Sequence, residues 1–292
     1  MARPASDSEE TRMDNATRMV REALESNGVI PDSKYEIFAQ GSYANNTNVR
    51  NNSDIDINIC FTDAFFCKLP SGTTKEQYGL TDYALYSFDR FKNDVERILV
   101  DKFGRDQVFR KNKCIHIKGN SYRTEIDVVP TWLYRRYGSP IYMSYDEGVI
   151  LVSDSGDEVV NFPKQHLYNG RQHNVNTRDR YKKLVRIVKR IHINMEDDGY
   201  YKNQNITSFL LESMVYILPD RIYRCYTDYF DWNDVLKDAI VFWYNATKDD
   251  NDDWKEWTEV SEQLPLMTDH KWTRSDVNVF TCKMWNYLEY DK

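Results

Sequence analysis

The stretch Gln40-Gly41-Ser42-Tyr43, followed by Ser53-Asp54-Ile55-Asp56-Ile57, decides the fold that we expect for this chain. In a β-strand, residues two apart in the sequence project from the same face. Asp54, Asp56 and Asn58 therefore share one face of the strand. The opposite face is apolar (Ile55, Ile57, Ile59 and Phe61). The apolar face predicts packing against a core, which leaves two carboxylates side by side at a surface or in a cleft.

The two carboxylates repel each other at this spacing. With roughly 5 Å between them and an effective dielectric constant near ~20, the repulsion is about 3 kcal/mol. Aspartate is also a poor strand residue. A divalent cation removes both objections, and Mg²⁺ takes carboxylate oxygens together with water and substrate phosphates. Alone, an Asp-x-Asp pair is more often a solvated face than a metal site.

The Gly-Ser turn ahead of the carboxylates indicates a phosphate site. Residues 35–40 are predicted to form a strand, and residues 42–49 a short helix. Backbone N–H groups at a helix start, a glycine that permits close approach and a serine hydroxyl together suit a phosphate. Phosphates beside a two-carboxylate metal site are typical of nucleotidyl or phosphoryl transfer.

A third carboxylate is available in the alternating stretch Arg123-Thr124-Glu125-Ile126-Asp127-Val128-Val129-Pro130. Glu125 and Asp127 lie on the same face of this predicted strand, so either could complete the metal site. The ordered set of Gly-Ser turn, Asp-x-Asp strand and third acidic strand is much more specific than any of its parts.

This ordered set resembles the polymerase-β-like nucleotidyltransferases. It is most similar to the bacterial CD-NTases, relatives of animal cyclic GMP-AMP synthase that make cyclic oligonucleotide signals in anti-phage defence. The resemblance extends from about residue 10 to about residue 220, and the short length of the chain looks most like the E clade. The matching stretches are Gln40-Gly41-Ser42-Tyr43-Ala44-Asn45-Asn46-Thr47, Ser53-Asp54-Ile55-Asp56-Ile57, Glu125-Ile126-Asp127-Val128-Val129-Pro130, Asn169-Gly170, Tyr181-Lys182-Lys183-Leu184-Val185-Arg186-Ile187-Val188-Lys189 and Thr207-Ser208-Phe209-Leu210-Leu211-Glu212.

The resemblance implies a mechanism and selects Asp127 over Glu125. Two Mg²⁺ ions, for which Mn²⁺ can substitute, would be held by Asp54, Asp56 and Asp127. They would activate a ribose hydroxyl for attack on the α-phosphate of a nucleoside triphosphate, with release of pyrophosphate. A linear dinucleotide would then turn over in the same site and cyclise.

The resemblance also implies nucleotide-binding residues. Ser42, with Gln40 and Gly41 beside it, would hold the donor phosphates. Lys189 and Ser208 match family positions that contact the donor triphosphate, and Phe209 matches one that stacks on the base, although a phenylalanine here is more often a core residue. Lys182, Arg186 and Lys189 also fall at i, i+4 and i+7, which places them on one face of a predicted helix.

Together, these patterns predict an α+β fold. A polymerase-β-like nucleotidyltransferase core of mixed sheet and helices, with an N-terminal helix, would occupy residues 1–165. A helical C-terminal lobe would occupy residues 166–292, with a nucleotide cleft between the lobes. The helical periodicity covers about 6–27, 83–102, 177–197, 205–218, 231–247 and 276–290. A loop is expected over 67–80, and a β-hairpin with turns near Glu147-Gly148 and Ser155-Gly156.

Composition limits the compartment and the partners. The net charge of −7 argues against generic coating of nucleic acid, and Lys111, Lys113 and Lys118 are most simply one solvated strand face. The five cysteines show neither a disulfide framework nor zinc spacing (Cys60, Cys67, Cys114, Cys225 and Cys282). No apolar run approaches the ~20 residues of a membrane span. We therefore expect a soluble cytoplasmic protein with no membrane partner.

The substrates are less well defined. Asn161 and Asn169 precede the basic helix, and their amides could hydrogen-bond a base edge, although each is more simply a turn residue. We expect ATP as one substrate, with UTP or a second ATP as the other. Family members differ in whether they need RNA or a partner protein as activator, and an effector that senses the cyclic nucleotide is expected downstream. Two alternatives remain: a related nucleotidyltransferase acting on RNA ends, a protein or a small molecule, and a catalytically inactive RNA-binding relative.

Overall fold

A computed structural model describes residues 7–31, 34–49, 54–81, 86–142, 144–223, 231–267 and 272–291. Residue 6, Ser53, residues 83–85 and Cys225, which were named above, lie outside this range. The chain forms two compact units. The strand unit comprises residues 5–43 and 53–163, and the helical unit comprises residues 1–4, 44–52 and 164–292. The sequence predicted a single boundary near residue 165. The observed division differs because residues 44–52 belong to the helical unit.

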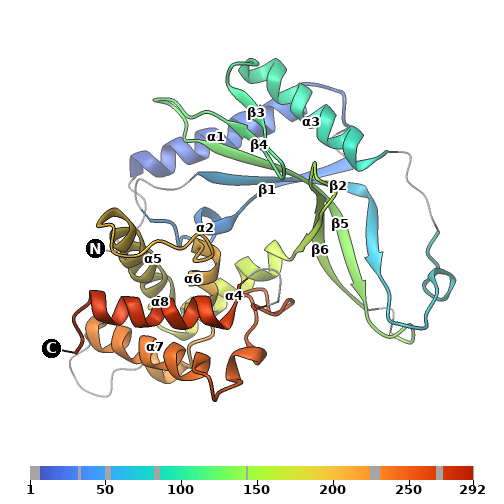
Figure 1. Cartoon of the computed structure of the whole chain (residues 1–292). Coiled ribbons are helices and arrows are strands. Elements are labelled where there is room, and N and C mark those ends of the chain that lie inside the picture. The colour runs from blue at the N-terminus through green and yellow to red at the C-terminus, as the bar shows by residue number, and fades with distance from the viewer. Residues whose placement is uncertain are drawn as a thin grey trace. The chain divides into compact units, whose positions relative to one another are not determined.

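A mixed sheet forms the centre of the strand unit (Figure 1). Its main path runs β1 (Tyr35–Gln40), β2 (Ile55–Lys68), β5 (Ile126–Tyr137), β4 (Ile115–Ile117) and β3 (Val108–Arg110). β2 and β5 are parallel, whereas β1 pairs with β2, and β4 with β5, in the antiparallel sense. β6 (Tyr145–Val152) pairs in the antiparallel sense with the second half of β5, and β7 (Glu158–Asn161) pairs with β6.

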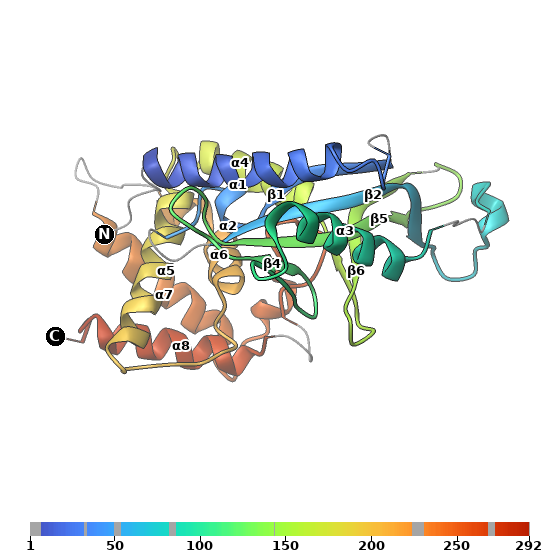
Figure 2. The same cartoon turned by 90° about the horizontal axis from the view of Figure 1, so that it is seen from above.

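The two faces of this sheet differ as the alternation predicts. Ile55, Ile57 and Ile59 are completely buried on one face of β2. Helices α1 (Asp7–Glu25) and α3 (Phe88–Phe103) lie on the same side of the sheet (Figures 1 and 2). They contribute a buried apolar set to the core (Met13, Ala16, Val20, Ala23, Leu24, Phe91, Val95, Ile98 and Leu99). The carboxylate-bearing face is the opposite one.

Several local predictions for the strand unit need correction. Helix α2 is a single turn, Gly41–Ala44, rather than a helix over 42–49. Beyond it, Asn45, Thr47 and Asn48 are buried, and the polar side chains of Asn45 and Thr47 find partners outside the segment. Glu147 and Gly148 lie within β6 rather than in a turn, whereas Gly156, at φ 89°, does turn the chain between β6 and β7. The loop expected over 67–80 contains the end of β2 and a short 3₁₀ helix, η2 (Lys75–Tyr78).

The helical unit contains α4 (Pro163–Asn176), α5 (Tyr181–Asp197), α6 (Ser208–Tyr216), α7 (Trp232–Thr247) and α8 (Arg274–Tyr287). Two short 3₁₀ helices, η3 (Asp220–Tyr223) and η4 (Asp253–Glu256), connect them. Tyr181, Trp243 and Phe280 are completely buried at its centre. The four helices predicted from residue 177 onward are all present; α5, α6 and α7 lie within the predicted bounds, α8 begins and ends earlier than predicted, and α4 was not predicted. Asn169-Gly170, which was expected to form a turn, lies in its interior.

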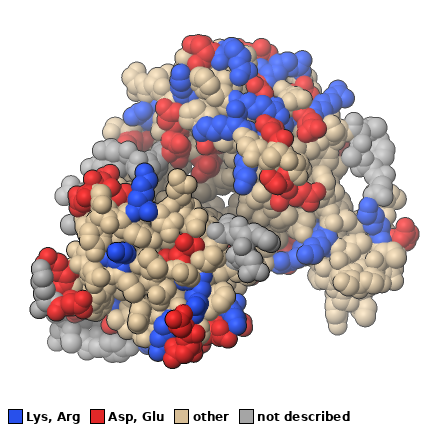
Figure 3. All heavy atoms as spheres, viewed as in Figure 1, with Lys and Arg blue, Asp and Glu red and all other residues tan. Residues whose placement is uncertain are grey.

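The surface and the cysteines agree with the composition. On the face that Figure 3 shows, Lys and Arg side chains are interspersed with Asp and Glu side chains. Within the described residues, Cys60, Cys67, Cys114 and Cys282 are free thiols. None of the described helices is both long enough and apolar enough to cross a membrane.

Candidate active site

The register of the sheet aligns four polar residues in one row. Gln40 on β1 pairs with Asp56 on β2, Asp56 pairs with Asp127 on β5, and Asp127 pairs with His116 on β4. Partners in adjacent strands have side chains on the same face, roughly 5 Å apart at their Cβ atoms. The row therefore brings Asp56 and Asp127, which are far apart in the sequence, directly beside each other.

A second polar layer supports this row. Asn58, completely buried on the same face of β2, donates a hydrogen bond from Nδ2 to Gln40 Oε1 at 3.2 Å. Asn58 Oδ1 accepts a hydrogen bond of 2.7 Å from Thr131 Oγ1. The amide of Asn58 is thus fixed from both sides, which keeps Gln40 beside the carboxylates.

Gly41 brings the predicted phosphate turn against Asp56. Its φ of 72° lies in the left-handed region that glycine adopts without strain. A Cβ atom at this position would lie 2.4 Å from Asp56 Oδ2, so no other residue fits without displacing the carboxylate. Ser42 follows in the single turn of α2. The Gly-Ser turn and the Asp-x-Asp strand are therefore in direct contact.

Burial and the charge of neighbouring carboxylates perturb two of the three aspartates. Burial, followed by the charges of Asp127 and Asp54, raises the pKa of Asp56 to about 6. Burial and the charges of Asp127 and Glu125 also raise the pKa of Asp54. Both shifts indicate negative charge that the surrounding protein does not balance, as is common in functional sites.

Asp127 is the best compensated of the three aspartates. Its Oδ1 atom lies 2.7 Å from His116 Nδ1 and 3.1 Å from Lys111 Nζ. Burial alone would raise the pKa of Asp127, but hydrogen bonds from His116, Lys111 and Cys114 outweigh it and lower the pKa. The other ring nitrogen of His116, Nε2, lies 2.7 Å from Glu125 Oε2. Glu125, the alternative third ligand in the sequence, thus contacts the histidine that holds Asp127.

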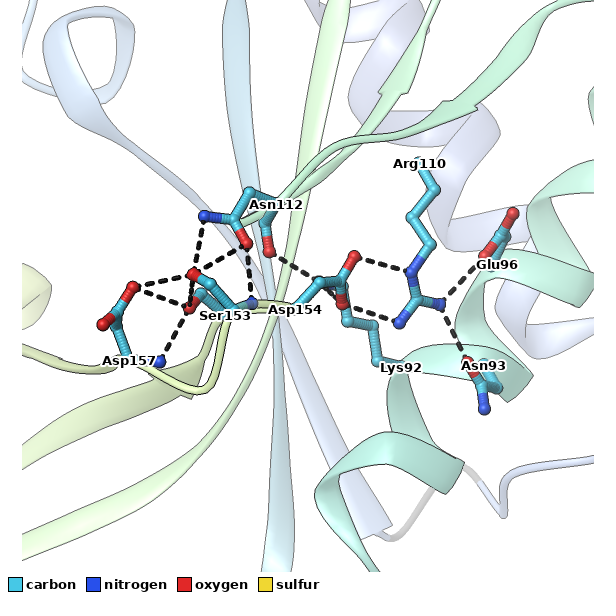
Figure 4. Close-up of polar contacts among 9 residues, drawn as sticks. Lys92, Asn93, Glu96, Arg110, Asn112, Ser153, Asp154 and Asp157 are labelled. Carbon is cyan, nitrogen blue, oxygen red and sulfur yellow. Dashed lines mark hydrogen bonds and ion pairs between the residues drawn. The ribbon is translucent and has the colours of Figure 1, made fainter.

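A polar network fixes the turn that carries Lys111 (Figure 4). Asn112 in this turn accepts a hydrogen bond at its backbone carbonyl from Lys92 Nζ at 2.9 Å. Its side-chain Oδ1 accepts one from the backbone N–H of Ser155 at 3.0 Å. The Asp154 carboxylate accepts a hydrogen bond of 2.7 Å from Lys92 Nζ and hydrogen bonds of 2.8 Å from both Nε and Nη2 of Arg110. The hydrogen bond from Arg110, despite the opposing effect of burial, lowers the pKa of Asp154 to about 2.

The three aspartates fit a magnesium or manganese site by their chemistry. They supply hard oxygen donors from β2, from the residue just before it and from β5, the type of ligand that these ions prefer. In the part of the chain that the structure describes, no three His, Cys, Asp or Glu side chains are already gathered closely enough to enclose an ion. The raised pKa values of Asp54 and Asp56 identify the excess negative charge that a divalent cation would neutralise.

The nucleotide-binding residues predicted on α5 are buried in the helical unit. Lys189, 3% exposed, lies with its Nζ atom 2.8 Å from Glu212 Oε2. Arg186, 6% exposed, donates from Nη1 to the carbonyl of Asn46 at 2.6 Å. The cationic row predicted on this helix is therefore largely buried among protein groups.

The other predicted nucleotide contacts lie at element ends or in helices. Ser208 is exposed at the first position of α6, and Phe209 stacks on Trp272 with ring centroids 5.7 Å apart and an interplanar angle of 15°. Asn161 ends β7, and Asn169 in α4 donates from Nδ2 to the carbonyl of Val260 at 3.0 Å. Their roles toward a nucleotide stay predictions.

Three residues that the structure identifies were missed from the sequence as parts of a site: His116, Lys111 and Glu212. A signal existed for His116, because Ile115-His116-Ile117 places one polar residue between two completely buried isoleucines. This is the same alternation that identified Asp54 and Asp56. Lys111 was assigned to a solvated face, and no local signal marked Glu212.

Comparison with known proteins identifies the family. Residues 168–289 match the cGAS/DncV-like nucleotidyltransferase C-terminal helical domain. The chain is 47% identical over 289 residues to the cyclic dipyrimidine nucleotide synthase CdnE of Cecembia lonarensis, covering 99% of this chain and 96% of that protein. The chain belongs to the CdnE group of cGAS/DncV-like nucleotidyltransferases. The predicted CD-NTase family and E clade are thus confirmed, and the protein is a cyclic nucleotide synthase.

Solved CdnE structures have the same fold. The Rhodothermus marinus CdnE c-UMP-AMP synthase, solved with Apcpp and Upnpp, has a TM-score of 0.85 and 25% identity over 100% of this chain and 95% of that one. The Elizabethkingia meningoseptica CdnE cyclic dinucleotide synthase, solved with GTP and Apcpp, has a TM-score of 0.80 and 33% identity over 99% and 96%. The predicted α+β fold class, with a nucleotidyltransferase sheet and a C-terminal helical domain, is confirmed.

Proposed function

We propose that this CdnE protein makes a cyclic dinucleotide that contains at least one pyrimidine, with UTP as a substrate. The relative with 47% identity is named a cyclic dipyrimidine nucleotide synthase, and the Rhodothermus marinus structure holds analogues of ATP and UTP. The combination of ATP with UTP, which was expected from the sequence, is the second candidate for the two substrates. The Elizabethkingia meningoseptica structure holds GTP and an ATP analogue, so CdnE proteins differ in the nucleotides that they bind.

The row of Asp56 and Asp127 across β2 and β5 is the observation that carries the chemistry. We propose that Asp54, Asp56 and Asp127 hold Mg²⁺, or Mn²⁺ in its place. When bound, the ions supply positive charge for the triphosphate and make a ribose hydroxyl easier to deprotonate. Asp127, whose pKa is lowered by hydrogen bonds from His116 and Lys111, would accept that proton.

The Gly41-Ser42 turn is the proposed cradle for the donor phosphates. Gly41 lets the backbone approach Asp56 closely, so a phosphate held by the turn would lie near the carboxylates that would hold the ions. The Ser42 hydroxyl and the backbone N–H groups of the turn are the donors. Attack on the α-phosphorus breaks its bond to the bridging oxygen and releases pyrophosphate. A second transfer within the linear dinucleotide closes the ring.

Asn161 and Asn169 stay our candidates for reading the base. Because Asn169 donates to the carbonyl of Val260, part of its amide is already used within the protein. We therefore favour Asn161, at the end of β7, as the residue whose replacement changes the bases of the product. By analogy with the family, the product would signal in anti-phage defence to an effector that senses it, and RNA or a partner protein remains a candidate activator.

Product analysis tests this function. The purified protein is incubated with each α-labelled nucleoside triphosphate and with mixtures, in Mg²⁺ and then in Mn²⁺, and phosphatase-resistant products are identified by mass spectrometry. A cyclic product containing uridine or cytidine, absent with the Asp54→Asn/Asp56→Asn variant, is expected. A product with only purines would contradict the assigned bases. A linear or RNA-linked product would indicate another nucleotidyltransferase, and no product even with structured RNA would favour a binding protein.

A further inference from the structure

β4 and β6 pair with the same edge of β5, at different places along it. β2 occupies one edge of β5, so both strands lie on the other edge. The pairing with β4 covers Ile126–Val128, and the pairing with β6 covers Trp132–Tyr137. Residues 111–114, between β3 and β4, lead into the interval from one side, and residues 153–157, between β6 and β7, lead into it from the other. The two turns therefore meet where the strand pairing is interrupted.

Main-chain and side-chain hydrogen bonds join the two turns (Figure 4). The backbone N–H of Asp154 donates to the carbonyl of Asn112 at 2.9 Å. Lys92 Nζ donates to the same carbonyl at 2.9 Å and to Asp154 Oδ1 at 2.7 Å. Arg110, at the end of β3, donates to the other side of the Asp154 carboxylate and, from Nη1, to Glu96 Oε2 at 3.0 Å. Lys92 is thus the residue through which α3 holds both turns at once.

The burial of Lys92 distinguishes it from the other partners in this network. The residue is 1% exposed and lies on the face of α3 that buries Phe91 and Val95. Lysine is almost never buried to this extent unless it is paired. An apolar residue would pack at this position at lower cost, since replacing a buried ion pair with apolar side chains is often neutral or stabilising. The ammonium group therefore points to a role in the position of the turns rather than in the packing of the helix.

The turn that Lys92 holds also carries a group that contacts Asp127. Lys111, the residue next to Asn112, lies with its Nζ atom 3.1 Å from Asp127 Oδ1. Its backbone N–H donates to the carbonyl of Cys114 at 2.9 Å, which closes the turn. His116, the other partner of Asp127, is fixed independently by the pairing of β4 with β5. A shift of Asn112 would therefore move Lys111 directly and leave His116 in place.

We propose that Lys92 is a positioning residue, which fixes the turn of residues 111–114 through Asn112 and thereby keeps Lys111 against Asp127. The ammonium group of Lys111 opposes a cation at Asp127, so Lys92 sets how tightly the carboxylates hold a metal ion. Without Lys92, the side chain of Lys111, which is 47% exposed, would move away from Asp127 into solvent. The part of the proposal that concerns the metal rests on the proposed function, whereas the fixing of the turn does not.

The experiment compares Lys92→Met, Lys111→Met and the double variant with the unchanged protein. Methionine keeps the unbranched shape of the lysine side chain and removes its charge. Hydrogen exchange of residues 108–117 is expected to rise about tenfold in Lys92→Met. Affinity for Mn²⁺, measured by electron paramagnetic resonance, is expected to shift about threefold in the same direction as in Lys111→Met. In the Lys111→Met background, Lys92→Met should change that affinity by less than about 1.5-fold, because residues that act through one contact are not additive.

Asp154→Asn is a second, milder variant, because the Asp154 side chain is 36% exposed and asparagine can still accept from Lys92. It is expected to give the same changes at a smaller size, and it replaces Lys92→Met if that variant does not fold. Asp146→Asn is its matched control, since Asp146 also lies in an exposed pair with an arginine, Arg136, but at the other end of β6. This control should leave the exchange of residues 108–117 and the affinity for Mn²⁺ unchanged.

Two results would overturn the proposal. Unchanged exchange of residues 108–117 in Lys92→Met would show that the turn does not depend on the lysine. Additive shifts of Mn²⁺ affinity in the double variant would show that Lys92 does not act through Lys111. If the unchanged protein binds no Mn²⁺ and makes no product, the proposed function fails, while the exchange of residues 108–117 still decides whether Lys92 fixes the turn.

Discussion

Asp56 on β2 and Asp127 on β5 are direct partners in the register of two parallel strands. Two carboxylates in this relationship destabilise a sheet, since like charges directly opposite each other repel. The strands cannot slip to relieve the repulsion, because a one-residue shift would bring buried isoleucines to the carboxylate face. The sheet thus holds an unfavourable pair at a fixed separation, which is what a metal-dependent phosphoryl site needs.

Asp56→Asn is expected to stabilise the metal-free protein at neutral pH. The folded-state pKa of Asp56 is raised to about 6, so its contribution to stability is present below the unfolded pKa near 3.8 and is lost as pH rises through 6. That loss is about 2–3 kcal/mol. In EDTA, the Tm of Asp56→Asn should therefore exceed that of the unchanged protein by roughly 5–10 °C at pH 7.5. The two Tm values should converge near pH 4.

Asp101→Asn is the control for this pH dependence, since Asp101 is an exposed residue near the end of α3. Because solvent screens an exposed charge, this variant should change the Tm only slightly. Added Mn²⁺ should raise the Tm of the unchanged protein more than that of Asp56→Asn. A constant Tm difference for Asp56→Asn across pH would show that the carboxylate repulsion is relieved in some other way.

His116→Phe should impair catalysis without loss of the fold. The ring would keep its place in β4 but lose its contacts with Asp127 Oδ1 and Glu125 Oε2, both at 2.7 Å. Replacing groups that orient metal ligands costs about 10–100-fold in metal affinity or activity. We expect a loss of this size in kcat, measured by product formation, and a weaker affinity for Mn²⁺, measured by electron paramagnetic resonance. Glu125→Gln, which can still accept from the ring, should lose less, and an equal loss in both variants would argue against an orienting role.

Lys111→Met is expected to have the opposite effect on metal affinity. Its ammonium lies 3.1 Å from Asp127 Oδ1 and competes electrostatically with a cation bound there. Because the lysine side chain is 47% exposed, solvent screens much of this effect, and we expect Mn²⁺ to bind about threefold to tenfold more tightly. Lys113→Met, an exposed lysine in the same turn, is the control. Weaker binding by Lys111→Met would mean that the lysine orients Asp127 for the metal.

Gly41→Ala should abolish most activity. Gly28→Ala is the control that separates backbone strain from displacement of the Asp56 carboxylate. Both glycines have positive φ, 72° and 69°, so both variants carry the strain of a left-handed alanine. A Cβ atom on Gly28 meets nothing within 4 Å, whereas one on Gly41 would displace Asp56 Oδ2. We expect similar strain of about 1 kcal/mol in each, measured by urea denaturation, but a loss of about 100-fold in kcat only for Gly41→Ala. If the two variants had comparable kcat values, the close approach of Gly41 to Asp56 would not be needed for catalysis.

Local alternation predicted the face on which each aspartate lies, because that depends only on neighbouring residues in one strand. The pairing of Asp56 with Asp127 depends on a contact across about 70 residues of chain, which the family resemblance supplied and periodicity could not. The alternation around His116 is the same kind of signal, but β4 has only three residues, so a single polar residue between two isoleucines did not stand out. Helix α4 was missed for a related reason. Its Asn-Gly pair indicates a turn locally, and only the contact of Gly170 with Asn45 accounts for it.

The cations of α5 show a different limit. Their spacing correctly placed them on a helix, but a sequence does not distinguish a lysine that faces a ligand from one that faces a buried glutamate. Lys189 has the second environment in this structure, and its partner Glu212 lies on another helix. The distinction depends on three-dimensional burial alone.

The passage of residues 44–52 through the helices also governs how the gene can be recombined. A chimera that exchanges everything after Pro163 between two relatives would bring in a foreign Glu212 while keeping the resident Asn45 and Thr47, whose side chains donate hydrogen bonds to it. The exchangeable module is discontinuous, because the short stretch near the start of the chain must be inherited together with the C-terminal half. Crossovers that keep these two stretches together should yield folded hybrids. Crossovers that separate them should yield hybrids that fold poorly, even when each parental half is intact.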